Sequence, residues 1–183
     1  MDYVQGFKDL FEDREFTQFK EFKCCLEKYM KDFNVIYVLG SSTKSNNGRL
    51  KYTNMSYRCI NYKRRKSVSR GVRHVHSHAT CCQSRFNVAK RKSILVVSSF
   101  SLEHNHELSA SLFLAHPINR RLTADELNGY RYLLEYNSPT AELKQYVADA
   151  YGKYMTTTDV CNMRRRLRPS AKSKRDKEYF RRS

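Results

Sequence analysis

The sequence predicts an α+β protein, with an N-terminal helix packed on a small antiparallel β-sheet and then a three-helix unit of helix-turn-helix type. Three observations support this fold class. Aromatic residues recur at helical spacing near the N-terminus, short β-like runs follow up to residue 100, and helix-capping signals appear after residue 117. The expected boundaries are 1–116 for the helix and sheet, 117–168 for the helical unit and 169–183 for a basic, disordered tail.

The first element is an amphipathic helix, expected from about residue 14 to 32. Asp13 stands just before it and is a residue type that caps helix N-termini. We interpret the aromatic side of this helix as a packing face against the sheet, and Cys24 and Cys25 as ordinary core or boundary residues. The residues that define the face are Phe16, Phe19, Phe22, Leu26, Tyr29, Met30 and Phe33.

The sheet is expected to contain four or five antiparallel strands. The first falls within 34–42, where branched and aromatic residues are frequent, and 40–48 has the composition of a polar loop with turn-forming residues. Basic linkers separate the other β-like runs, which are 50–52, 56–62, 84–89 and 93–100.

Three helices are expected in the C-terminal part. Thr123 can cap the first, Ser138-Pro139 opens the second, and Gly152 ends it. Either Thr157 or Thr158 can cap the third. Three short helices in this order predict a compact unit of helix-turn-helix type.

The charge distribution points to a polyanionic partner. The formal net charge is +17, and no Asp or Glu occurs between Phe33 and Leu102. Such a charge is most simply neutralised by DNA or RNA. Metal-dependent nucleases and transposases hold magnesium with several carboxylates, and this segment has none, so we do not expect an enzyme.

Cysteine and histidine in the same segment have the chemistry of a zinc site. Zinc binds thiolate and imidazole in a tetrahedron, and such ligands at strand ends can pin a sheet together. Cys59, Cys82, His104 and His106 offer four such ligands, and the histidines reach one ion if they share a side of a strand or a tight turn. Adjacent Cys81 could replace Cys82. The sequence therefore predicts one structural Zn²⁺ and a zinc-stabilised β-sheet.

The residues around these ligands resemble a known superfamily. The runs Ser56-Tyr57-Arg58-Cys59, Cys82-Gln83-Ser84-Arg85 and His104-Asn105-His106-Glu107-Leu108 are similar to the WRKY and glial-cells-missing zinc fingers, which include FLYWCH and far-red-impaired-response domains. Over roughly residues 10 to 165 the chain looks closest to the transposase-derived N-terminal domains of SWIM-type zinc-finger proteins. The resemblance implies a β-sheet DNA-binding domain with the four zinc ligands named above.

Two departures from the superfamily limit what the resemblance implies. The family commonly has glycine where this chain has Cys81, which leaves the choice between the two adjacent thiols open. The tryptophan-containing strand that reads bases in plant WRKY proteins is missing, and the chain has no tryptophan. A base preference therefore cannot be transferred.

Candidate DNA contacts fall into three groups. By position, the strand that would enter the major groove spans 36–44, where a solvated loop is the alternative. A second group is expected on phosphates, and arginines of the last helix would add a further contact, unless that unit serves packing or oligomerisation instead. The strand candidates are Tyr37, Ser41, Ser42, Thr43 and Lys44. The phosphate candidates are Arg58, Lys63, Arg64, Arg65, Lys66 and Arg85, and those of the last helix are Arg164, Arg165 and Arg166.

The sequence thus predicts a non-catalytic, zinc-dependent DNA-binding protein that docks a β-strand edge in the major groove of double-stranded DNA. We expect a nuclear protein, either transposase-derived or a regulator of transcription. No targeting signal or membrane anchor is expected. The alternatives are an RNA-binding module, in which tyrosines and phenylalanines stack on bases, and a protein-interaction adaptor.

Overall fold

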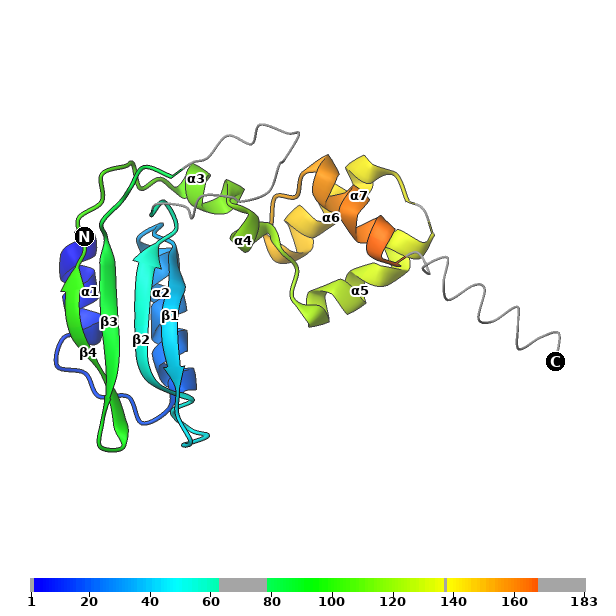
Figure 1. Cartoon of the computed structure of the whole chain (residues 1–183). Helices are drawn as coiled ribbons and strands as arrows, with labels where there is room; N and C mark the ends of the chain where they lie inside the picture. The colour runs from blue at the N-terminus through cyan, green and yellow to red at the C-terminus, as the bar shows by residue number, and fades with distance from the viewer. Residues whose placement is uncertain (1, 63–78, 137, 168–183) are drawn as a thin grey trace, which may run out of the picture. The chain divides into compact units, whose positions relative to one another are not determined.

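The computed structural model describes residues 2–62, 79–136 and 138–167 (Figure 1). The chain forms two compact units, Met1–Phe113 and Leu114–Ser183, which are described separately below. Lys63, Arg64, Arg65 and Lys66 lie outside the described residues, as does the basic tail expected at 169–183.

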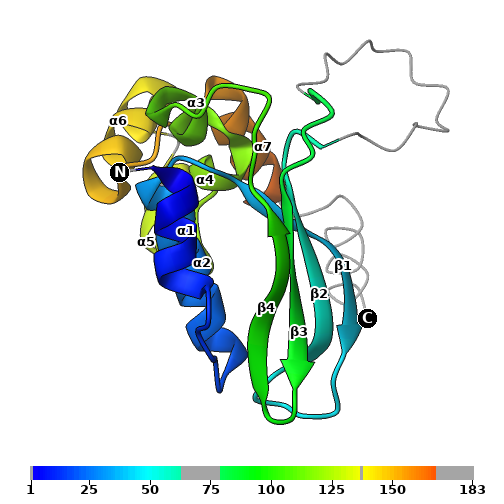
Figure 2. The same cartoon turned by 90° about the vertical axis from the view of Figure 1, so that its left-hand side faces the viewer.

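The first unit is a four-stranded antiparallel sheet with two helices on one face, which confirms the α+β class. The strands are β1 (Tyr37–Lys44), β2 (Tyr52–Cys59), β3 (Arg85–Arg91) and β4 (Ile94–Ser101), in the spatial order β1-β2-β3-β4. Figure 2 shows α1 and α2 on the same side of the sheet. Every neighbouring pair is antiparallel, so each strand starts where its predecessor in the sheet ends.

Two strand boundaries differ from the prediction. The runs 50–52 and 56–62 belong largely to one strand, β2, because Lys51 takes a positive φ of 61° just before it and the intervening residues pair with both neighbours. The polar residues after Gly40 continue β1 to Lys44 instead of forming a loop, because their backbone pairs with β2 through a bulge. β1 is therefore an edge strand with a polar, exposed second half.

The N-terminal helical region consists of two helices, so the single helix expected over 14–32 is wrong in its first part. α1 spans Tyr3–Phe11 and α2 spans Phe19–Asp32. Asp13 does not cap α2, since its φ of 57° lies in the left-handed region, and the N-cap is Gln18. Phe16 is extended and exchanges backbone hydrogen bonds with Leu95 of β4, which ties the connection between the helices to the sheet edge.

The core between helices and sheet is mainly aromatic. The Phe86 ring lies 5.2 Å from Phe7, 5.1 Å from Tyr37 and 5.0 Å from Tyr57, measured between centroids. At Gly6 of α1 a Cβ atom would lie 2.1 Å from the ring of Phe33, so only glycine permits this approach between the two helices. Such ring pairs contribute stability beyond their buried area and fix the position of the sheet.

The second unit packs α5 (Ala124–Glu135), α6 (Thr140–Tyr151) and α7 (Thr157–Leu167) around a small apolar core. Thr123 caps α5 in a capping box, and Gly152 ends α6 with a φ of 62°, as predicted. The cap of α7 is Thr156, and not Thr157 or Thr158, because its hydroxyl accepts from the backbone N–H of Asp159. Two short helices not predicted from the sequence, α3 (Ala110–Ala115) and α4 (Pro117–Arg120), precede this bundle.

Ion pairs join the ends of these helices. Lys153 bonds Glu126 of α5, and Arg120 of α4 lies 3.1 Å from a carboxylate oxygen of Asp159 in α7. Burial raises the pKa of both acids, but hydrogen bonds outweigh it and hold both pKa values below their ordinary range; for Glu126 the first of these bonds comes from Lys153, and for Asp159 from Thr156. Both carboxylates therefore stabilise the unit in their charged form.

Candidate metal centre

The sheet topology brings the four predicted ligands to one place. Cys59 is the last residue of β2, Cys82 lies just before β3, and His104 and His106 follow β4. Because β2, β3 and β4 are adjacent and antiparallel, the end of β2, the start of β3 and the end of β4 meet at the same end of the sheet. The four ligand atoms all lie within 4.8 Å of one another.

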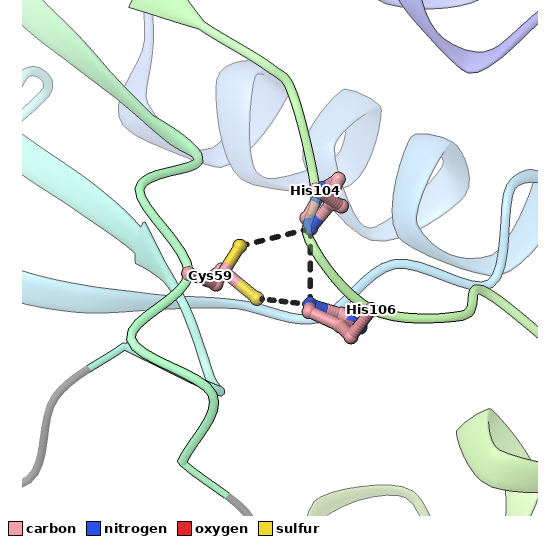
Figure 3. A group of neighbouring side chains, drawn as sticks. Cys59, His104 and His106 are labelled. Carbon is pink, nitrogen blue, oxygen red and sulfur yellow. Dashed lines mark hydrogen bonds between the residues drawn. The ribbon is translucent and has the colours of Figure 1, made fainter.

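The separations between ligand atoms suit a tetrahedral ion. Cys59 Sγ lies 3.1 Å from His106 Nε2, and Cys82 Sγ lies 3.4 Å from His104 Nδ1. The two histidine nitrogens are 3.2 Å apart (Figure 3). With zinc–sulfur bonds of about 2.3 Å and zinc–nitrogen bonds of about 2.0 Å, the edges of a tetrahedron are roughly 3.3–3.8 Å long. The site needs only small shifts to reach that geometry and is close enough to bind a metal ion.

Outer hydrogen bonds orient both imidazoles. His106 Nδ1 lies 3.1 Å from the carbonyl oxygen of Glu107, which can only accept, so this nitrogen carries the proton and Nε2 offers its lone pair to the centre. His104 faces the centre with Nδ1, and its Nε2 lies 3.3 Å from the hydroxyl of Tyr37. That hydroxyl is 2.6 Å from Ser84 Oγ. A relay of contacts from His104 through Tyr37 to Ser84 therefore positions the first imidazole, and Nε2 donates to Tyr37 when Nδ1 is the nitrogen that ligates.

Burial favours the neutral forms of the cluster in the absence of a cation. Burial raises the pKa of the Cys59 thiol to about 12, and burial together with His106 lowers the pKa of His104 to about 4. The imidazole is thus neutral, as ligation requires, whereas forming thiolates in this environment needs a positive charge close by. The backbone N–H of Asn61 already points at Cys59 Sγ at 3.4 Å, as a thiolate ligand favours.

Asn105 lies between the two histidines and links them to the segment that leads to Cys82. Its side-chain amide donates to the carbonyl of Thr80 at 2.8 Å, and its oxygen accepts from the Thr80 hydroxyl at 2.9 Å. Asn105, Tyr37 and Ser84 were not predicted from the sequence as supports of the site. For Asn105, the available signal was its position within the His-Asn-His triplet.

The structure chooses between the adjacent thiols. Cys82 is fully buried and belongs to the cluster, whereas Cys81 is exposed and takes a φ of 57°. The backbone turn at Cys81 directs only the second thiol inward, so the alternative in which Cys81 replaces Cys82 is wrong.

The predicted DNA contacts differ in their accessibility. Tyr37 is only 3% exposed and bonds Ser84 inside the unit, so its assignment as a surface contact is wrong, because the start of β1 faces the helices. Ser41, Ser42, Thr43 and Lys44 are exposed on the edge strand β1. Arg58 is half-buried and Arg85 is exposed.

The arginines of α7 also differ in their accessibility. Arg164 donates to the Thr140 hydroxyl at 3.2 Å and to the carbonyl of Ser138, so its guanidinium holds the start of α6 within the helical unit and is not free for a partner. Arg165 and Arg166 are exposed. Arg166 lines a pocket of about 260 Å³ between α4, α5 and α7.

Comparisons of the chain with protein-family models, with curated proteins and with solved structures find no match. Among the helices that the structure describes, none is both long and apolar enough to span a bilayer. The interpretation of the metal centre therefore depends on its geometry and on the charge of the segment around it.

Proposed function

We propose that this chain is a non-catalytic, zinc-dependent protein that binds double-stranded DNA. The observation that carries the proposal is the convergence of two thiols and two imidazoles at one end of the sheet. The sequence that forms this sheet, residues 33–102, contains no Asp or Glu. Cys59, Cys82, His104 and His106 would hold one Zn²⁺, and the ion would join the ends of three strands in place of a larger apolar core.

The donor set favours a structural over a catalytic ion. Catalytic zinc sites commonly keep three protein ligands and one open position, whereas structural sites are closed by four. All four ligand atoms here come from the protein, and both cysteines are at most 1% exposed. A substrate would have no position to enter without displacing a ligand.

The edge strand β1 supplies a surface suited to the major groove. Its second half, Ser41–Lys44, is exposed and carries hydroxyl groups and one cation. A β-element fits the width of the major groove, where short polar side chains can reach base edges. Among the described strands β1 pairs with β2 alone, so no described strand occupies its outer side.

Nuclear location, a role in transcription and a transposase-derived origin are part of the same proposal. They depend on the resemblance carried by the residues around the four ligands and on the net charge of +17. RNA is the alternative polyanion. The sheet core uses most of its aromatic rings internally, among them Phe7, Phe22 and Phe86, so they are not available as stacking platforms.

The experiment is duplex binding by the full chain, measured with zinc and after chelation, with single-stranded RNA as competitor at matched salt. We expect the zinc-loaded protein to bind duplex DNA and to keep it bound when RNA is added. Chelation of the zinc should abolish DNA binding and also the β-sheet signal in far-ultraviolet circular dichroism spectra. Binding that survives chelation unchanged, or displacement of the duplex by RNA, would contradict the proposal.

A further inference from the structure

One face of the sheet is open within the first unit. Helices α1 and α2 cover the other face (Figure 2), and no described element of this unit covers the open one. Side chains alternate along a strand, and Met55, Tyr57 and Cys59 of β2 are buried on the helix side. Arg58, which lies between two of them, therefore points to the open face.

Arg58 is held in place on that face. Its guanidinium lies over the ring of Tyr62, 4.8 Å from the centroid, and its side chain passes closely over Gly40 of β1. A Cβ atom at Gly40 would lie 3.1 Å from Cδ and Nε of Arg58, so the glycine makes room for the arginine. Nε is buried and has no hydrogen-bond partner among the residues that the structure describes. Nε is therefore closed off against β1, and a ligand on the open face would have to use the other nitrogens of this guanidinium.

A second arginine stands directly opposite. The strand register pairs Arg58 with Arg85 of β3, whose side chain is exposed on the same face. Directly opposed residues of antiparallel strands have Cβ atoms roughly 5 Å apart, and like charges there are destabilising. The ion pairs found among the described residues include neither Arg58 nor Arg85, so none offsets this repulsion. An anion bound between the two guanidinium groups would remove it.

The neighbouring row of the open face continues the same surface with small polar groups. The register places Ser41, Ser56, Asn87 and Ser99 side by side across all four strands. Hydroxyl and amide groups neither repel a phosphate nor obstruct its approach. An extended polyanion could therefore cross the sheet beside the arginine pair.

We propose that Arg58 and Arg85 form a clamp for a single phosphate group of the nucleic-acid backbone, an inference that rests on the proposed function. Guanidinium groups bind phosphate through paired N–H donors, and Arg58 is already oriented by Tyr62. The clamp is joined to the metal centre, because Cys59 follows Arg58 directly and Cys82 lies three residues before Arg85. Loss of the ion would misalign both arginines.

The test is a double-mutant cycle on zinc-loaded full chain, with a short random-sequence DNA duplex as the probe and affinity measured over a range of salt concentrations. Arg58→Gln and Arg85→Gln should each weaken binding roughly tenfold. Each should also reduce the slope of log affinity against log salt by about 0.9, the value for one lost phosphate contact. Because both arginines serve one phosphate, the double variant should lose no more than either single variant.

Two further variants serve as controls. Arg58→Lys keeps the charge but lacks the planar fork, so we expect weaker binding with an unchanged salt slope. Arg91→Gln removes a cation from the same face of β3 away from the pair, and its effect should add to that of Arg85→Gln. Arg85→Gln should not lower the unfolding temperature, because it relieves a repulsion.

The same binding measurements separate a wrong function from a wrong clamp. If wild-type protein with zinc does not bind the duplex, the proposed function is wrong. If it binds and the effects of the Arg58 and Arg85 variants add fully, the two side chains contact separate groups and the clamp is wrong. The clamp is also wrong if Arg85→Gln binds DNA as tightly as wild type. It is equally wrong if Arg85→Gln has a lower unfolding temperature and loses DNA binding because less of the protein is folded.

Discussion

Replacing Tyr37 by phenylalanine tests the relay that orients the metal centre. The change removes one hydroxyl, which lies 2.6 Å from Ser84 Oγ and 3.3 Å from His104 Nε2, and leaves the ring in the core. Burial raises the pKa of Tyr37, so its hydroxyl stays protonated. If His104 ligates through Nδ1, its Nε2 carries the proton and donates to the Tyr37 hydroxyl, which then donates to Ser84. Ser84 is fully buried and would be left without this partner.

The expected magnitude follows from the groups left unpaired. A buried polar group that loses its partner costs about 1–3 kcal/mol, and loss of an outer-shell partner of a histidine ligand typically weakens metal binding about 10- to 100-fold. We therefore expect Tyr37→Phe to lower the free energy of unfolding by about 2 kcal/mol and zinc affinity by at least tenfold.

The assay is competition for zinc against a chromophoric chelator, combined with thermal unfolding of the loaded protein. Tyr57→Phe is the matched control, because among the described residues the hydroxyl of this buried tyrosine contacts only the Met55 sulfur, at 3.9 Å, and lies outside the relay. Zinc affinity should be unchanged in the control. If Tyr37→Phe binds zinc as tightly as wild type, the relay does not orient His104.

Three further predictions concern the ligands, the helical unit and its turn. Cys82→Ser should abolish stoichiometric zinc binding in the chelator assay and Cys81→Ser should not; equal losses would contradict the assignment of the ligand. Because the pKa values of Glu126 and Asp159 are lowered in the folded state, their stabilisation is fully present above the ordinary carboxylate range and is lost as the pH falls from there through the lowered values. The helical circular dichroism signal of an E126Q/D159N variant should accordingly change less than that of wild type when the pH is lowered. An identical acid transition in the two proteins would refute this. Gly152→Ala places a side chain at a φ of 62° and should cost about 1 kcal/mol of unfolding free energy in chemical denaturation, whereas an unchanged midpoint would count against strain there.

The ligand set could be predicted from the sequence because its chemistry is local and rare. Cys59, Cys82 and the His104–His106 triplet stand in short recognisable runs, and antiparallel neighbours necessarily bring their ends together. The choice of Cys82 over Cys81 depended on a backbone turn that two identical side chains do not reveal.

Other parts of the fold depended on tertiary contacts. Tyr37 was expected at the surface because a strand position does not by itself show which face the helices cover. The break between α1 and α2 arises where Phe16 leaves helical conformation to pair with Leu95, a contact distant in sequence. The clamp residues Arg58 and Arg85 were each recognisable as basic, but their opposition is a property of the strand register.

Zinc K-edge X-ray absorption on the full chain after stoichiometric loading tests the two-thiol, two-imidazole site most directly. We expect one tightly bound ion per chain with two sulfur neighbours at about 2.3 Å and two nitrogen neighbours at about 2.0 Å. A coordination shell without sulfur, or the absence of stoichiometric binding, would contradict it.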